Sequence, residues 1–309
     1  MRKLLLTSAA LCLLTVPAVA QSRIAVSMTS FDNPFLTILL NGMREKAKTA
    51  NVDLIAEDAQ LDPAKQLNQV QNFVANGVDA MIVNAVDGDS TAAITRAAAE
   101  AEAGIPLVYV NHPPAELDGG MPDKTAFVGS NELDSGTMEA EAVCKLLGGK
   151  GKAVILMGPL ENHAALVRTK DVEKVFSRSD CNIEIVEKQT ANWNRTQAQD
   201  LVSSWLTAGI AFDAVVANND EMAIGAIQAI KASGTAMKDV VIAGIDATPE
   251  GLAAMKASEL DVTVFQNATR QGEVAVQAAL DLSTGKPVDK TLWVPFELVT
   301  PDTMAAYSK

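Results

Sequence analysis

Polar side chains stand at the ends of several short apolar runs in this chain. Asn84, Asn111, Asn219 and Asp246 each follow a run rich in Val, Ile and Ala, and His112 comes directly after Asn111. Such amides and carboxylates can hydrogen-bond a ligand, because amides both donate and accept and carboxylates accept. Any one of these residues could instead simply form a turn. Four of them at the same point of successive runs favour a ligand-binding site.

The sequence contains few residues or motifs that are typical of an active site. His112 and His163 are the two histidines, and the chain has no G-x-S-x-G, H-E-x-x-H or C-x-x-C motif. The segment GGKGKAV at 148–154 precedes a predicted strand, which indicates a turn rather than a phosphate loop. His163 is expected at the start of a helix, without a partner at metal-ligand spacing. We expect no enzyme, no metal site and no cofactor, while a glycosidase-like pair of carboxylates stays open.

The elements that position these residues follow an alternating pattern. Short β-branched runs alternate with Ala-rich amphipathic segments, which is typical of βαβ units. The predicted helices include 63–76, 89–103, 133–147, 220–233 and 268–284. The predicted strands are 24–30, 52–58, 80–85, 106–111, 126–131, 153–158, 183–189, 214–219, 240–246, 262–267 and 293–299.

The apolar character of these strands predicts burial on both faces, with helices covering parallel sheets. Two series of strands in tandem predict an α/β fold with two doubly wound parallel-sheet domains, divided near residues 129–131. Ligands of such sheets bind outside the carboxyl ends of the strands. The polar residues at the strand ends are therefore in the expected place for a binding site.

The first 20 residues have the pattern of a secretory signal peptide. Arg2 and Lys3 precede an apolar run at 4–16, and AVA at 18–20 predicts cleavage near Ala20. A membrane anchor would need an apolar run of about 20 residues. A lipoprotein would use Cys12, which follows a Leu where small residues are expected. We expect the mature chain to be exported and to begin near Gln21.

The composition bears on two questions: whether the protein binds nucleic acid, and whether its cysteines form a disulfide. Of the 309 residues, 25 are Lys or Arg and 38 are Asp or Glu; two of the basic residues lie in the leader, so the mature chain carries 23 against 38, or −15. This charge repels nucleic acid, which we do not expect as a partner. After removal of the leader, Cys144 and Cys181 would remain, and an oxidising compartment favours a disulfide between them. The sequence does not show whether the two residues lie close enough to form one.

Four motifs carry a resemblance to a known family. FDNPFL at 31–36, NNDEMAIGA at 218–226, GIDATPEG at 244–251 and FQNATRQG at 265–272 resemble the ribose-binding protein group of periplasmic solute-binding proteins. The resemblance implies a periplasmic binding protein type I fold, with a three-crossover hinge near 129–131, 265–268 and 294–297. Its N-terminal lobe would comprise 21–129 and 268–294, and its C-terminal lobe 130–267 and 295–309.

The family resemblance also implies a function. The protein would be the periplasmic substrate-binding component of a carbohydrate or polyol ABC importer, which closes on its ligand and docks transiently on a membrane permease. Binders of this type are usually monomers. An adaptor for a chemoreceptor and an exported sugar-modifying enzyme are the alternatives from other functional classes.

Carried over by position, the resemblance assigns nine ligand-binding residues. Acidic and amide groups would bond ligand hydroxyls, while Phe35 and Trp193 would supply flat aromatic walls. By default, Phe35 would be a core residue, Trp193 a loop anchor and Arg168 a solvated charge. The nine residues are Asn33, Phe35, Asn111, His112, Arg168, Trp193, Asn219, Asp246 and Gln266.

Departures from the ribose pattern bear on the ligand. Asn111 and His112 stand where ribose binders usually have Asp and Arg, and this loss of a bidentate clamp argues against ribose. The segments ANNDEMAIGA, AGIDATP, LDVTVFQ and VPFELVTP look most like those of the myo-inositol-binding members. We expect myo-inositol, with another monosaccharide or an acyclic sugar alcohol as alternatives.

Overall fold

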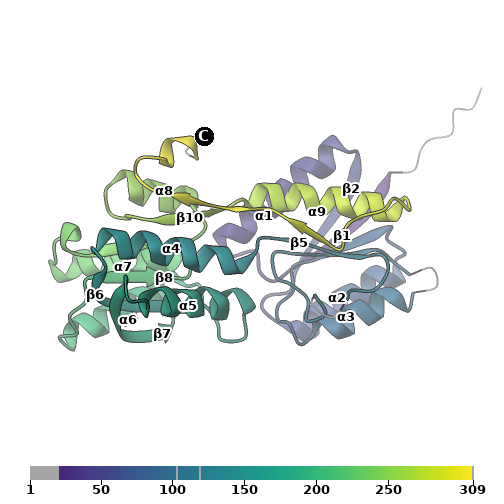
Figure 1. Cartoon of the computed structure of the whole chain (residues 1–309). Coiled ribbons are helices and arrows are strands. Elements are labelled where there is room, and N and C mark those ends of the chain that lie inside the picture. Colours follow the sequence, from purple (N-terminus) through teal and green to yellow (C-terminus); the bar gives the residue numbers. More distant parts are fainter. Residues whose placement is uncertain (1–20, 102–103, 118–119, 308–309) are drawn as a thin grey trace, which may run out of the picture.

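The computed structural model describes residues 21–307, apart from 102–103 and 118–119. The predicted signal peptide and Cys12 lie outside the described residues. The chain forms two α/β halves side by side: the N-terminal half is mostly purple and blue, the other is mostly teal and green, and yellow C-terminal segments run over both (Figure 1). Within the described residues, no helix is both long and apolar enough to span a membrane.

The N-terminal half is built on a six-stranded sheet in which every neighbouring pair is parallel. The strand order is β11-β5-β4-β3-β1-β2. The strands are β1 (Ser22–Met28), β2 (Val52–Asp58), β3 (Ala80–Val83), β4 (Leu107–Val110), β5 (Thr125–Gly129) and β11 (Thr291–Trp293).

Helices cover both faces of this sheet, which explains its continuous apolar strands. α1 (Pro34–Thr49) and α9 (Ala268–Ser283) pack together on one face, and α2 (Pro63–Ala75) and α3 (Thr91–Ala99) cover the other (Figure 1). Along β1, Ile24 belongs to the first core and Ala25 to the second. A polar residue on either face of the strand loses its water and needs a buried partner, and Ser27 of β1 has one in Gln69, to whose Oε1 it donates at 2.7 Å.

The C-terminal half repeats this plan on a four-stranded parallel sheet of order β7-β6-β8-β9. Two short antiparallel strands lie beside it. Helices again cover the two faces of the parallel sheet. The elements are α4 (Glu132–Leu146), β6 (Lys150–Met157), α5 (His163–Phe176), β7 (Asn182–Thr190), α6 (Arg195–Thr207), β8 (Ala214–Ala217), α7 (Asp220–Ser233), β9 (Val241–Ala243), α8 (Pro249–Lys256), β10 (Thr263–Gln266) and β12 (Phe296–Val299).

One predicted strand is wrong. The run 293–299 was expected to be continuous, but it is divided between β11, which pairs with β5, and β12, which pairs with β10. Pro295 lies at the break and has no N–H for a sheet hydrogen bond. The apolar pattern continues because both short strands are partly buried, although in different sheets.

The chain passes between the two halves at three places. These are 130–131 between β5 and α4, residue 267 between β10 and α9, and 294–295 between β11 and β12. The bounds of the lobes, 21–129 with 268–294 and 130–267 with 295–309, stay a prediction. Three separate connections leave no single linker whose composition would mark a boundary.

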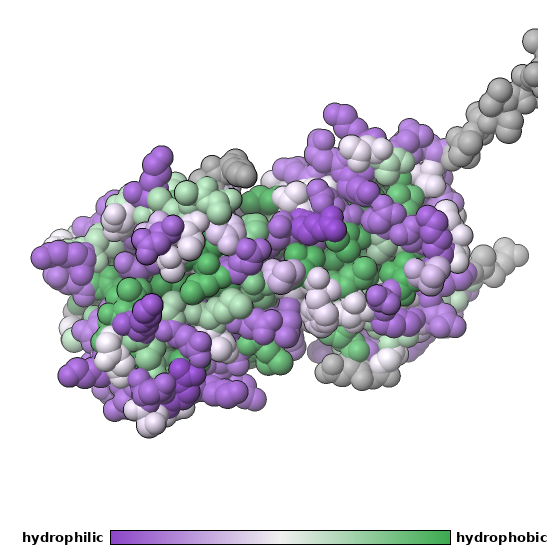
Figure 2. Space-filling view, turned by 45° about the horizontal axis from the view of Figure 1, so that its top comes forward, coloured by the Kyte–Doolittle hydropathy of each residue, from purple (hydrophilic) through white to green (hydrophobic). Residues whose placement is uncertain are grey.

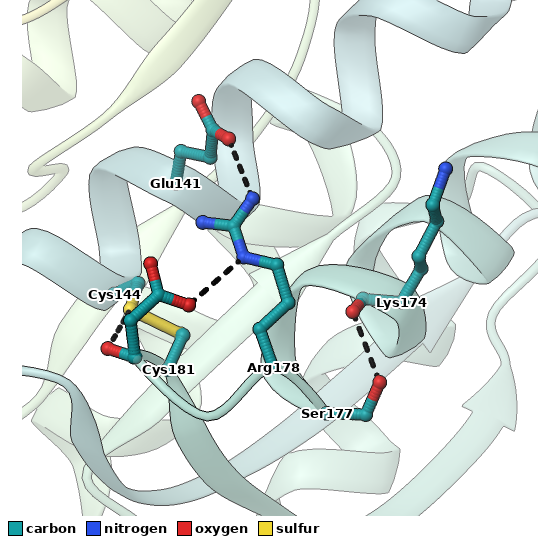
Figure 3. The surroundings of a disulfide bond; sticks show 7 residues. Glu141, Cys144, Lys174, Ser177, Arg178 and Cys181 are labelled. Carbon is teal, nitrogen blue, oxygen red and sulfur yellow. Dashed lines mark hydrogen bonds and ion pairs between the residues drawn. A yellow bond between two sulfur atoms is a disulfide. The ribbon is translucent and has the colours of Figure 1, made fainter.

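Cys144 and Cys181 both lie in the C-terminal half. A disulfide joins Cys144, near the end of α4, to Cys181, just before β7, with the Cα atoms 5.8 Å apart. Figure 3 shows Arg178 beside this bond, with its guanidinium paired to Glu141 of α4 at 2.8 Å. The disulfide therefore closes a loop that contains β6 and α5.

Candidate functional site

A cavity of about 600 Å³ lies between the two halves, and side chains from both line it. In the space-filling view the molecule narrows between these halves (Figure 2). The lining residues lie at or after the carboxyl ends of β1 to β4 on one side and of β6 to β10 on the other. All nine residues predicted from the sequence are among them: Asn33, Phe35, Asn111, His112, Arg168, Trp193, Asn219, Asp246 and Gln266.

Asparagine side chains at the strand ends serve as helix caps and line the cavity at the same time. The Oδ1 atom of Asn33 accepts from the backbone N–H of Leu36 at 3.1 Å, and that of Asn219 accepts from Met222 at 3.0 Å. Each cap turns the amide N–H₂ away from its helix. In the described part of the chain, these two N–H₂ groups donate to no protein atom, so they are available to a ligand.

Asn84 does not belong to this set, although it also ends an apolar run. It is fully buried, its Nδ2 donates to Val110 O at 3.1 Å, and its Oδ1 accepts from Thr29 N at 3.3 Å. Asn218 has the matching role in the other half, where its Oδ1 accepts from Gly158 N at 3.2 Å. These two asparagines tie the ends of neighbouring strands together.

Arg168 lies at the floor of the cavity and is 4% exposed, so the interpretation as a solvated charge is wrong. Its Nε and Nη2 donate to both oxygens of Glu132, at 2.7 and 3.0 Å. The carboxylate of Glu132 raises the pKa of Arg168 in spite of burial. Further bonds run to Asn218 O at 2.8 Å and to Gln266 Oε1 at 3.3 Å. One N–H on Nη1 therefore remains for a ligand, because a guanidinium has five.

Asp246 is 6% exposed and reaches the cavity from the segment after β9. Its backbone N–H donates to Val264 O at 2.8 Å, and its carbonyl accepts from Gln266 N at 3.2 Å. These bonds hold it at a φ of 126°, which is unusual for any residue except glycine. Burial raises the pKa of its carboxyl well above the ordinary value, and Arg168 opposes this shift.

The two predicted aromatic walls have different surroundings. Phe35 is 7% exposed, packs in the core of the N-terminal half and also lines the cavity. It is therefore a core residue, and its role as a wall for a ligand stays a prediction. Trp193 is half-buried, and its ring centroid lies 5.7 Å from the guanidinium carbon of Arg168. A Cβ atom on Gly158 would lie 2.2 Å from the indole, so glycine is required there for the ring to take this place.

His112 connects the two halves across the cavity. Its Nδ1 lies 2.6 Å from Ala85 O and must donate, since a carbonyl oxygen only accepts. Its Nε2 then accepts from Asn162 Nδ2 at 3.3 Å, from the start of α5 in the other half. Burial lowers the pKa of His112, and the neutral ring suits both bonds. Asn111 beside it donates to Gln271 Oε1 at 3.3 Å, and its own Oδ1 accepts from no protein group among the described residues.

The structure adds lining residues that the sequence interpretation missed. Glu132 stands in the first turn of α4, where an acidic residue is ordinarily explained by the helix dipole. Asn162 caps α5, and Arg195 forms a bidentate pair with Glu221 at 3.0 and 2.6 Å. The one signal for Glu132 was its position directly after a predicted strand. No group of three or more His, Cys, Asp or Glu residues suited to a metal occurs in the ranges that the structure covers.

Comparison with known proteins identifies the family. A model described as a periplasmic binding protein domain matches residues 24–287. A proposed rhizopine-binding protein of Rhizobium meliloti is 55% identical over 99% of each chain. The ribose import binding protein of Bacillus subtilis is 32% identical over 90% of this chain and 87% of its own. A solute-binding protein of an ABC transporter from Bacillus halodurans, solved with bound myo-inositol, is 40% identical, with a TM-score of 0.87 over 95% of this chain and 99% of that one.

The relatives share the two-lobed α/β fold, and they bind their solutes without transforming them. The cavity at the carboxyl ends of two parallel sheets fits that activity, because it gathers hydrogen-bonding groups from both halves. This chain belongs to the periplasmic binding protein family, as a sugar-type solute-binding protein of ABC transporters in the ribose-binding group.

Proposed function

We propose that this chain is the periplasmic substrate-binding component of an ABC importer for a cyclic polyol of the inositol class, with myo-inositol as the reference ligand. The observation that carries the proposal is the convergence of nine side chains from both halves on one cavity. The Bacillus halodurans relative with bound myo-inositol supports the choice of ligand.

The hydrogen-bonding groups of the cavity suit a ring that bears hydroxyls on every carbon. Asn33 and Asn219 offer amide donors, and Arg168 offers one more N–H. The carboxylate of Asp246 and the Oδ1 of Asn111 are acceptors. Each ligand hydroxyl could donate to one group and accept from another, while Phe35 and Trp193 cover the C–H faces.

Binding would take place by closure of the two halves. The His112–Asn162 hydrogen bond at 3.3 Å joins the halves directly. A ligand that contacts both halves binds the closed arrangement more tightly than the open one, and so shifts the population toward it. The closed protein would dock on the membrane permease after export through the predicted leader at 1–20.

A thermal-shift screen with inositols, pentoses, hexoses and alditols tests the proposal. Ligand at about 100 times its Kd should add about 2.7 kcal/mol to the free energy of unfolding. We expect myo-inositol to give the largest shift among the neutral compounds. Trp193→Ala should reduce the shift, whereas Trp293→Ala should not, because Trp293 is 53% exposed and outside the cavity. Absence of a shift with every polyol would overturn the proposal.

A further inference from the structure

The segment that carries Asp246 into the cavity has a strained backbone. Asp246 and Ala247 have φ angles of 126° and 49°, which are uncommon for residues other than glycine. Such a conformation persists only where the surrounding structure enforces it. The position of the Asp246 carboxylate therefore depends on the groups that hold the backbone of residues 246–248.

Three consecutive backbone N–H groups of this segment have hydrogen-bond partners. That of Asp246 donates to a backbone carbonyl of β10 at 2.8 Å. That of Ala247 donates to Thr263 Oγ1 at 3.1 Å. That of Thr248 donates to Asp220 Oδ2 at 2.7 Å. Two of the three bonds end on side chains, so a substitution can remove them while the sheet keeps its own hydrogen bonds.

The side chains of Asp220 and Thr263 form one connected group. Thr263 Oγ1 donates to Asp220 Oδ1 at 2.7 Å, and Thr248 Oγ1 donates to Oδ2 at 3.1 Å. The backbone N–H of Asp220 donates to Ile245 O at 2.8 Å. Asp220 therefore holds the chain on both sides of Asp246.

Asp220 is fully buried and is not among the residues that line the cavity. It is the first residue of α7, and its neighbours Asn219 and Glu221 do line the cavity. Burial raises the pKa of its carboxyl to about 7, and the hydrogen bonds from Thr263 and Thr248 oppose this shift. The donors around the carboxylate thus stabilise the charged form, which burial disfavours.

Two glycines leave room for the carboxylate of Asp220. A Cβ atom on Gly251 would lie 2.1 Å from its Oδ2, and one on Gly244 would lie 2.7 Å from its Oδ1. These glycines are the first and last residues of the GIDATPEG motif, which contains Asp246. The two ends of this motif therefore fit closely around the side chain of Asp220.

We propose that Asp220 and Thr263 are positioning residues for ligand binding, which hold the backbone of residues 246–248 so that the Asp246 carboxylate stays in the cavity. The inference rests on the proposed function, because it requires Asp246 to contact the ligand. Neither Asp220 nor Thr263 lines the cavity. Their effect on affinity should therefore appear only through Asp246.

Thr263→Val tests the proposal without any change of charge. Valine has nearly the shape of threonine but lacks the hydroxyl, so the N–H of Ala247 and the Oδ1 of Asp220 lose a partner. The Kd for myo-inositol, measured by calorimetry at about pH 8, should rise about tenfold. This pH lies above the pKa of Asp220, so its carboxylate is charged. Thr263→Ser keeps the hydroxyl and should bind like the wild type.

Two controls separate positioning from a general loss of stability. Thr95→Val removes another buried hydroxyl, which lies 2.9 Å from Tyr109 Oη in the N-terminal half. It should lower the free energy of unfolding but leave the Kd unchanged. In an Asp246→Ala background, Thr263→Val should change the Kd by less than about twofold, because the side chain that it positions is gone. An equal loss of affinity in both backgrounds would overturn the proposal, and so would an unchanged Kd of Thr263→Val by itself.

Crystal structures of the ligand-free wild type and Thr263→Val test the geometry independently of any ligand. The Asp246 carboxylate should shift by more than about 0.5 Å, while Arg168 keeps its place. A carboxylate that does not move would contradict the proposal. If the wild type does not bind myo-inositol, the proposed function fails, and the crystal structures decide the positioning role. If Thr263→Val does not fold, Thr248→Val, which removes one of the donors to Asp220, replaces it in both measurements with the same direction expected.

Discussion

The nine predicted site residues differ in how directly they are available to a ligand. Asp246 and the amides of Asn33 and Asn219 present groups to the cavity that have no hydrogen-bond partner among the described residues. Arg168, in contrast, donates four of its five N–H groups to protein atoms. Arg168 therefore also shapes the site, because it fixes Glu132 and Gln266. Its replacement should affect stability as well as binding.

The buried pair of Arg168 and Glu132 gives a stability prediction. Arg168→Met leaves the 6% exposed carboxylate of Glu132 unpaired and should lower the free energy of unfolding by about 3–5 kcal/mol. The double variant with Glu132→Gln should recover most of this loss in urea denaturation. Arg178→Met breaks an exposed pair with Glu141 and should change little. A fully stable Arg168→Met variant would show that Glu132 does not depend on the arginine.

The neutral state of His112 predicts how affinity depends on pH. A protonated ring cannot accept from Asn162, and burial between the two halves lowers the pKa of the ring. Closure should therefore be favoured above the ordinary histidine pKa of about 6.5, and affinity should fall as the pH drops below it. Calorimetry between about pH 5 and pH 8 should show this fall in the wild type and a weaker one in His112→Gln. Identical pH profiles for the two proteins would exclude His112 as the cause.

At the scale of elements, helix caps fix the orientation of several side chains that line the cavity. Asparagine caps six of the helices within the described residues, and the caps of α1, α5, α6 and α7 line the cavity. The parallel sheets bring these helix starts to one edge. A cap fixes which atom of the amide points to the helix, so the ligand-facing atom is fixed as well.

The disulfide is attached near the C-terminal end of α4, and the first turn of the same helix lines the cavity. Cys144 stands twelve residues after Glu132 on α4, which corresponds to about 18 Å along the helix. Replacing both cysteines with serine should lower the free energy of unfolding by about 2–4 kcal/mol. The Kd for the ligand should stay the same, as calorimetry at a temperature well below the unfolding transition can check. A tenfold loss of affinity would mean that the position of α4 depends on the disulfide.

At the scale of the whole molecule, three crossings of the chain connect the halves, so they can move relative to each other without losing their cores. The cores of the two halves are formed by separate clusters of buried side chains. We therefore propose that the cavity between them is the part of the structure that closes around a ligand.

Closure should be measurable as a change in size. Saturation with myo-inositol should decrease the radius of gyration in small-angle X-ray scattering. Asp246→Ala should show no such decrease at the same ligand concentration, because it lacks the buried acceptor. A radius that does not change when calorimetry shows saturation of the wild type would argue against closure on binding.

The sequence by itself determined the alternation of strands and helices, the parallel sheets and the strand ends where ligand groups belong. These follow from local periodicity, since a strand buried on both faces must be apolar throughout. The family motifs added the residues that line the cavity, including Arg168 and Trp193, which spacing alone does not select.

Only the tertiary structure decided which of these groups are already paired. Asn84 and Asn219 look alike in sequence, yet one joins three strands and the other faces the cavity. Glu132 and Arg168 are far apart in the chain and meet because α4 and α5 pack side by side. Charge balance depends on such long-range pairs, so the unpaired carboxylate of Asp246 could be recognised only when all its neighbours were in place.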